Sequence, residues 1–161
     1  MADIIDYIYQ YGDKTLDEMP FNEIDSLVLS RVSYIPFHNI VSSHVPHKIT
    51  VLGAFKEFLN RYRDPYKKVL WHDDVPLMAA MAESQRFKKM ELCAYKNILD
   101  PHREMQFAAI TICMGNGQIF ISFRGTDDTF LGWKEDLNMS FIPVIPSQQE
   151  GVRYFNYVCK N

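Results

Sequence analysis

The segment from Gln106 to Phe123 constrains the fold more than any other part of the sequence. Two apolar runs, QFAAITICM and QIFISF, lie on either side of a short Gly-Asn-Gly segment. A tight type I′ turn needs positive φ angles at both central residues, and Asn-Gly adopts them readily. The segment therefore predicts an antiparallel hairpin. A third apolar run, from Glu91 to Leu99, predicts a strand that pairs on one side of this hairpin.

The first half of the chain has the pattern of helices instead. Apolar residues recur at helical spacing in the segments that follow Asn22 and Thr50, and again from Pro76 to about Phe87. Asn22 and Thr50 are suited to cap the first two of these helices. The segment 34–48 between them contains two prolines and is expected to form a loop. We therefore predict a single domain over residues 1–161, with a helical region over about 1–90 and a sheet and crossover region over about 91–161.

Two further helices are predicted after the hairpin, at about 129–139 and 148–159. The second follows Ser147-Gln-Gln-Glu150, which has the pattern of a capping box directly after Pro146. A strand followed by helices normally leads through a crossover into a parallel strand. No receiving strand follows in this sequence, so we expect it to be cut off inside a repeating α/β unit. The strand 118–123 is then expected to be open along one side.

The composition argues against several classes of protein. The net charge of −3 disfavours a general nucleic-acid binder, and no apolar run is long enough to span a membrane. The acidic start MADIID leads into no apolar stretch, and the three cysteines are widely spaced, which indicates a cytoplasmic chain with reduced thiols. His38, His44 and His47 match no zinc-binding pattern, so we expect solvated loop histidines and neither a metal site nor a cofactor.

The tripeptide Arg124-Gly125-Thr126 lies where the last strand gives way to a helix. Gly125 allows a sharp turn and a close approach of the backbone to a ligand. Thr126 and the following amides would lie near a helix N-terminus, where N–H groups favour an anion such as the oxyanion of acyl transfer. A plainer interpretation is that Asp127 or Asp128 caps the helix and that Arg124 pairs with a carboxylate.

The segment QFAAITICMGNGQIFISFRGTDDTFLGWKEDLNMSF resembles the Phe-Arg-Gly-Thr segment of class 3 lipases, which have the α/β-hydrolase fold. More closely, the chain resembles the N-terminal half of a bacterial family of unknown function grouped with those lipases, the Mbeg-like hydrolase family. Five stretches carry this resemblance in order: FNEIDSLVLSRVSYIPF, SQRF, QFAAIT, FRGTDDTFLGWKEDLNMSF and PSQQEGVRYFNYV. The resemblance implies a partial α/β-hydrolase-like fold and the hydrolysis of carboxylic or lipid esters by a serine nucleophile.

The resemblance also implies roles for single residues. Thr126 matches the hydroxyl residue that supplies the oxyanion hole. The segment from Asp127 to Trp133 matches the lid of the fungal lipases, but it is short and acidic here, which argues against a lipid-activated lid. The other residues that support the motif are Arg124, Gly125, Asp127, Trp133 and Asp136, of which Trp133 and Asp136 are expected to pack and to hold the turn.

The nucleophile of such a family is expected in a Gly-His-Ser-x-Gly elbow on the strand after the last helix. The acid and the histidine of the triad are expected to follow it in the sequence. None of the nine serines lies in a Gly-x-Ser-x-Gly context. We therefore expect no catalytic residue in this sequence and no activity from the chain alone.

Three explanations for a missing nucleophile stay open. The chain is a truncated or split reading frame, or it pairs with a separate polypeptide that supplies the nucleophile half, or it is a non-catalytic binding or interaction module. A second copy of the chain is a further candidate partner, since it could cover the open strand. A downstream reading frame that encodes Gly-His-Ser-x-Gly would favour the first explanation.

Overall fold

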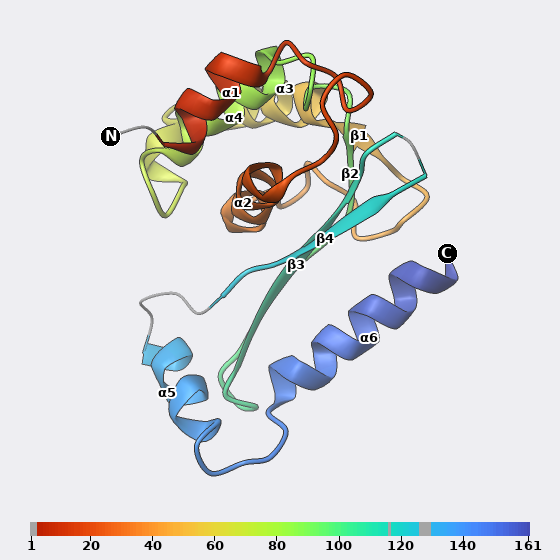
Figure 1. The fold of residues 1–161 in the computed structure, drawn as a ribbon. Coiled ribbons are helices and arrows are strands. Elements are labelled where there is room, and N and C mark those ends of the chain that lie inside the picture. Colours follow the sequence, from red (N-terminus) through yellow and green to blue (C-terminus); the bar gives the residue numbers. More distant parts are fainter. Residues whose placement is uncertain (1–2, 116, 126–129) are drawn as a thin grey trace.

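The computed structural model describes residues 3–115, 117–125 and 130–161 (Figure 1). Its helices are α1 (Ile4–Tyr11), α2 (Glu23–Arg31), α3 (Val51–Arg61), α4 (Asp74–Glu83), α5 (Phe130–Asn138) and α6 (Pro146–Lys160), with short 3₁₀ turns η1 (Val32–Tyr34) and η2 (Pro65–Lys67). The strands are β1 (Ile49–Thr50), β2 (Glu91–Asp100), β3 (Met105–Cys113) and β4 (Ile119–Phe123). The chain is therefore a mixed α/β protein, as the sequence predicts.

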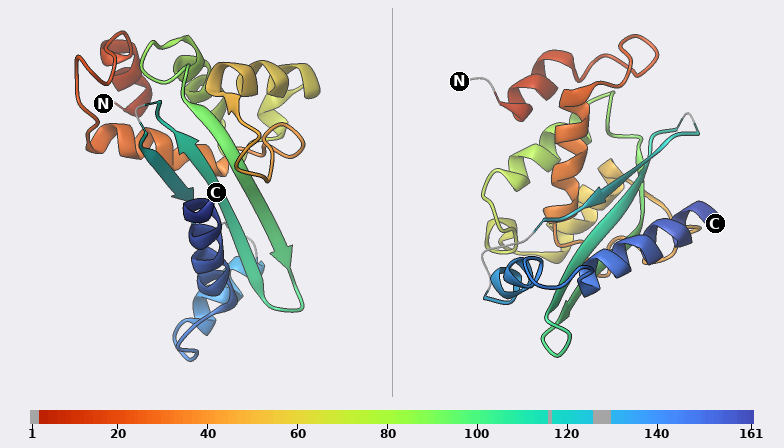
Figure 2. Two further views of the ribbon diagram at one scale, coloured as in Figure 1. Left: turned by 90° about the vertical axis from the view of Figure 1, so that its right-hand side faces the viewer. Right: turned by 60° about the horizontal axis from the view of Figure 1, so that its bottom comes forward.

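The strands form one antiparallel sheet in the order β1-β2-β3-β4. Figures 1 and 2 show α1–α4 on one face of this sheet and α6 across the other, and α5 packs near the start of β3. Two groups of buried apolar side chains fill the two interfaces. Along β3, Ile110 and Ile112 belong to the first group, whereas Phe107 and Ala109 belong to the second. Helices on both faces explain why this strand is apolar at successive positions.

The predicted helix starts at Asn22 and Thr50 are confirmed. Asn22 Oδ1 accepts hydrogen bonds from Ile24 N at 2.9 Å and from Asp25 N at 3.2 Å. Thr50 Oγ1 accepts a hydrogen bond from Gly53 N at 3.0 Å. Each side chain therefore satisfies backbone N–H groups that have no partner inside the helix.

Three details of the helical region differ from the prediction. α4 ends at Glu83 instead of near Phe87, and the Ser84 hydroxyl accepts a hydrogen bond from Phe87 N in the turn that follows. α1 and β1 are absent from the prediction altogether. They contain eight and two residues, which is too short for a clear periodic signal.

The hairpin between β3 and β4 is confirmed. The two strands pair in antiparallel register over residues 109–113 and 119–123, and β2 pairs with the other side of β3. Gly115 and Gly117 have φ angles of +89° and +81°, a conformation that glycine adopts without strain. Asn116 lies outside the described residues, so the type of the turn stays a prediction.

The predicted capping box at the start of α6 is wrong. The helix begins at Pro146, whose fixed φ angle suits the first helical position. Gln148 Oε1 accepts a hydrogen bond from Ile145 N at 3.2 Å, so the capping interaction lies two residues earlier than Ser147 and Glu150 would place it. The Glu150 carboxylate instead forms an ion pair with a lysine of β2.

β4 is the edge strand of the described sheet. Arg124 N donates to Ala108 O at 2.9 Å, which fixes the pairing of the antiparallel ladder. The backbone groups of the alternate residues Ile119, Ile121 and Phe123 therefore point away from β3, toward the open edge. The open side predicted for this strand is confirmed for the part of the chain that the structure describes.

A buried ion pair ties α2 to the segment before β2. The side chains of Asp25 and Arg86 have no exposed area, and Arg86 Nε donates to Asp25 Oδ1 at 2.7 Å. These hydrogen bonds to the carboxylate raise the pKa of the guanidinium, so Arg86 stays charged. Its terminal nitrogens also donate to the backbone carbonyls of Lys14, Thr15, Met19 and Pro20. The pair therefore fixes the connection between α1 and α2 as well.

Candidate functional site

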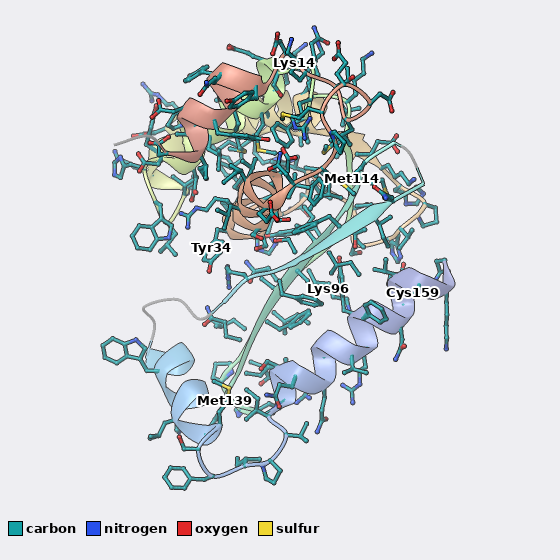
Figure 3. The ribbon with its side chains drawn as sticks, in the orientation of Figure 1. Lys14, Tyr34, Lys96, Met114, Met139 and Cys159 are labelled. Carbon is teal, nitrogen blue, oxygen red and sulfur yellow. The ribbon has the colours of Figure 1, made fainter. Side chains whose placement is uncertain are left out.

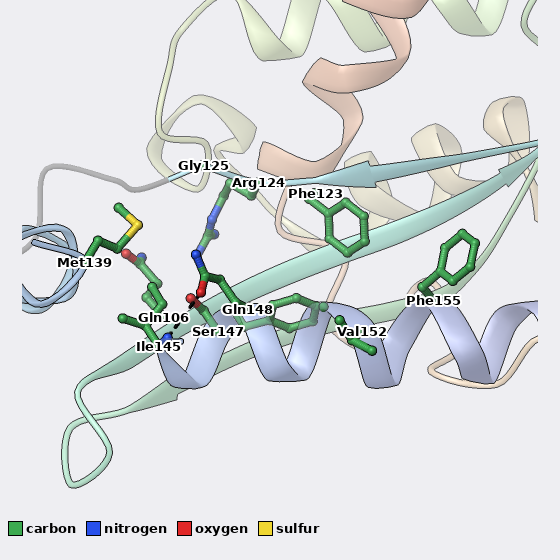
Figure 4. Close-up of a pocket in the computed structure, with 12 residues that line it drawn as sticks. Gln106, Phe123, Arg124, Gly125, Met139, Ile145, Ser147, Gln148, Val152 and Phe155 are labelled. Carbon is green, nitrogen blue, oxygen red and sulfur yellow. Dashed lines mark hydrogen bonds between the residues drawn. The ribbon is translucent and has the colours of Figure 1, made fainter. Parts of the chain in front are cut away.

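The end of β4 lies beside a cavity of about 540 Å³, which we call the α6 pocket (Figure 4). The pocket is bounded by β3, β4, the segment after α5 and the part of α6 up to Phe155. Its lining residues are Gln106, Phe107, Phe123, Arg124, Gly125, Met139, Ile145, Ser147, Gln148, Gly151, Val152 and Phe155. The segment singled out by the sequence therefore opens onto a space large enough for a small ligand.

The α6 pocket has a polar end and an apolar end. Figure 4 shows the polar side chains of Gln106, Arg124 and Gln148 at the end beside Gly125, with Met139 and Ile145 next to them. Phe123, Val152 and Phe155 lie at the opposite end, and the last two are more than half exposed. Such a layout suits a molecule with a polar head and an apolar tail.

Arg124 is held across the sheet. Its guanidinium donates to Asn97 Oδ1 at 3.3 Å, and Ala108 lies between the two residues in the register of the strands. Asn97 Nδ2 in turn lies 3.3 Å from His38 Nε2. The small side chain of Ala108 leaves the Arg124 side chain room to cross β3, so the orientation of the arginine is set by tertiary structure.

Gly125 allows a close approach to Tyr34. A Cβ atom at this position would lie 3.2 Å from the Tyr34 hydroxyl, closer than nine in ten real contacts of this kind. Glycine therefore lets the backbone pass Tyr34 directly after β4.

Tyr154 fastens α6 to the sheet beneath the pocket. Its side chain is fully buried, its ring packs against those of Phe107 and Phe123, and its hydroxyl lies 2.8 Å from Thr111 Oγ1. Burial raises the pKa of this phenol well above its ordinary value, so the hydroxyl stays protonated at physiological pH. The apolar wall of the pocket therefore rests on a fixed helix.

An ion pair strengthens the same attachment. Lys96 extends from β2 toward α6, where its Nζ lies 3.0 Å from Glu150 Oε1 (Figure 3). Arg153 NH1 donates to the other oxygen of Glu150 at 3.3 Å. Burial by itself would raise the pKa of Glu150, but the two cations outweigh it and hold the pKa below its ordinary value.

The structure places only some of the residues expected from the motif. Arg124 and Gly125 line the α6 pocket. Thr126 and Asp127 lie outside the described residues, so the oxyanion assignment stays a prediction. Trp133 lies on α5 with 63% of its surface exposed, which does not match the packing role expected for it. Asp136 falls within α5, but its side chain is also outside the described part.

Other kinds of site are not seen in the described part of the chain. Within residues 3–115, 117–125 and 130–161, no three histidine, cysteine, aspartate or glutamate side chains come together to hold a metal ion. In the same residues no helix combines the length and the apolar character needed to cross a lipid bilayer. Cys93, Cys113 and Cys159 are free thiols.

Several residues of the site are absent from the sequence prediction. Gln106 and Gln148 meet at the polar end of the pocket although they belong to β3 and α6, and Asn97 contacts Arg124 from β2. A polar residue at the start of the apolar run QFAAITIC is the one local signal that could have suggested Gln106. The others depend on the way in which distant elements pack.

Comparisons with known proteins give one match. A family model described as Mbeg1-like matches residues 81–161, which is half of the chain and includes β2–β4, α5 and α6. No curated protein and no solved structure matches the chain significantly. The family match covers most of the stretches that carry the resemblance, together with every residue that lines the α6 pocket. The chain therefore belongs to the Mbeg1-like family.

Proposed function

We propose that this chain supplies the oxyanion-hole side of a serine ester hydrolase with an α/β-hydrolase-like fold. The observation that carries the proposal is the position of Arg124 and Gly125, which follow β4, precede α5 and border the polar end of the α6 pocket. A turn of this kind can present backbone N–H groups to the oxygen that becomes negative during acyl transfer. Thr126 is the residue proposed to make that contact, with its side-chain hydroxyl as a second donor beside its backbone N–H group.

The nucleophile must come from polypeptide outside these residues. No serine of the sequence lies in a Gly-x-Ser-x-Gly elbow, and in the described residues no serine hydroxyl is hydrogen-bonded to a histidine ring. An unactivated serine hydroxyl is a poor nucleophile. In the proposed fold the nucleophile strand would lie parallel to β4 along its open edge, and α6 would be the crossover helix that leads into it.

The proposal predicts that the 161-residue chain alone turns over p-nitrophenyl esters no faster than background. A version extended through a downstream Gly-His-Ser-x-Gly strand should be active. Replacing Thr126 with alanine in the extended version should lower kcat about 100-fold, the effect of removing one oxyanion donor. Initial rates with acetate and butyrate esters would measure both effects.

Labelling with a fluorophosphonate supplies the control. The extended version should be labelled on a single serine, and the short chain should not be labelled. Turnover by the short chain that a fluorophosphonate abolishes would show that one of its own serines is reactive. That result would contradict the proposal.

A second candidate function is a non-catalytic interaction module. It is favoured by the open edge of β4, where Ile119 and Phe123 are nearly half exposed and no lysine or proline interrupts the strand. An unprotected edge of this kind invites pairing with another strand. A second copy of the chain could supply that strand.

For this candidate we expect a mass of about twice 18.8 kDa by light scattering at tens of micromolar. Ile121→Pro should restore the monomer, because the N–H group of Ile121 faces the open edge and its loss leaves the β3–β4 ladder intact. Ile121→Val keeps this N–H group and is the matched control. A monomeric wild-type chain would rule out pairing of this edge with a second copy.

A further inference from the structure

The α6 pocket has dimensions and chemistry that define a class of ligand. Its volume of about 540 Å³ lies within the usual range of roughly 300–1,000 Å³ for small-molecule sites. Among the lining residues that the structure describes, Arg124 alone carries a charge, and it lies at the polar end. The opposite end is walled by Phe123, Val152 and Phe155, so charged and amide side chains are confined to one end, where Met139 and Ile145 also lie.

From this layout we infer that the α6 pocket binds a straight acyl chain. The carboxyl or ester group lies beside Arg124 and Gly125, and the hydrocarbon tail runs along α6 toward Phe155. A tail in this position covers apolar surface that is otherwise exposed to water, which favours binding. The inference rests on the proposed hydrolase function for the placement of the carbonyl group, whereas the binding of the tail depends on the pocket alone.

Gly151 keeps the middle of the pocket open. A Cβ atom there would lie 3.8 Å from Phe107 and 3.9 Å from Phe123, at ordinary contact distance. A larger side chain would thus fit the backbone without strain but would fill the space between α6 and β4. Because glycine is a poor helix former, its replacement by leucine within α6 should not impair folding.

Calorimetric titration of the 161-residue chain with hexanoate, heptanoate and octanoate tests the inference. Each added methylene should tighten binding roughly twofold to fourfold, as expected for partial or full burial of the tail. Gly151→Leu should weaken octanoate binding about tenfold or more, since it displaces several methylenes. Phe155→Ala should weaken it less. Phe141→Ala is the matched control, because Phe141 is 79% exposed and lies outside the pocket.

The headgroup is tested separately. Arg124→Gln should weaken octanoate binding about fivefold and leave octan-1-ol binding unchanged, because only the carboxylate interacts with the charge. Affinities that do not depend on chain length, or that are equal in wild type and Gly151→Leu, would overturn the inference. Neither result depends on turnover. If the version extended through the downstream Gly-His-Ser-x-Gly strand lacked esterase activity, that result would count against the proposed function. It would not affect the inference that the pocket binds an acyl chain.

Discussion

Replacing Asp25 with alanine should lower the free energy of unfolding by about 3–5 kcal/mol, because it leaves the Arg86 guanidinium buried without its carboxylate. Neither side chain has any exposed area, and Arg86 Nε lies 2.7 Å from Asp25 Oδ1. The remaining acceptors of Arg86 are neutral carbonyls, among them those of Met19 at 2.9 Å and Pro20 at 3.2 Å. They cannot balance a buried positive charge. Urea denaturation followed by circular dichroism would measure the loss.

Glu23→Ala is the matched control for this experiment. Glu23 is an exposed acidic residue in the first turn of the same helix, so its loss should cost about 1 kcal/mol at most. Replacing Asp25 and Arg86 together with leucine and methionine should recover much of the lost stability, since no unpaired charge then stays buried. Equal urea midpoints for Asp25→Ala and Glu23→Ala would show that the ion pair contributes little.

Most of the correct predictions of the fold come from local sequence patterns. The caps at Asn22 and Thr50 and the β3–β4 hairpin involve contacts over a few residues, which short-range sequence rules describe well. The Asp25–Arg86 pair joins residues 61 positions apart. No periodicity or turn signal encodes such a pairing, although both residues lie in stretches that carry the family resemblance.

The candidate site likewise has one part that local sequence patterns predict and another part that depends on tertiary packing. Arg124 and Gly125 are predictable because a strand, a glycine and a helix follow one another in the sequence. The rest of the α6 pocket requires that β3 and α6 be packed together, which depends on buried contacts such as that between Tyr154 and Thr111. The prediction at Ser147 failed for a related reason. The helix begins at Pro146, before Ser147 could cap it, and the Glu150 side chain is bound by Lys96 instead of by the helix N-terminus.

The family match begins at residue 81, yet the matched part does not stand apart from the helices before it. Arg86 lies inside the match and is neutralised by Asp25, which lies outside it. Ser122 Oγ of β4 likewise donates to Ser30 O of α2 at 2.9 Å. The N-terminal helices therefore hold β4 in place from the face opposite α6.

Tyr154→Ala should also lower the free energy of unfolding by about 3–5 kcal/mol, the usual cost of removing a large buried ring. The ring is fully buried, and its centroid lies 6.1 Å from that of Phe107 and 5.8 Å from that of Phe123. Urea denaturation would measure this loss as well.

Tyr154→Phe separates the packing of the ring from the hydrogen bond of the hydroxyl. It keeps the ring and leaves Thr111 Oγ1 buried without its partner, so it should cost about 1–3 kcal/mol. Thr111→Val in the same background should recover part of that cost, because it removes the unpaired hydroxyl. A Tyr154→Ala variant as stable as Tyr154→Phe would show that the ring contributes little.

The same pair of variants connects the stability of α6 to ligand binding. Tyr154→Phe retains the ring under the pocket and should bind octanoate with the affinity of the wild type. Tyr154→Ala should bind it more weakly even under conditions in which the chain stays folded, because Val152 and Phe155 are then no longer held over β4. Equal octanoate affinities for the two variants would mean that the acyl chain binds away from α6.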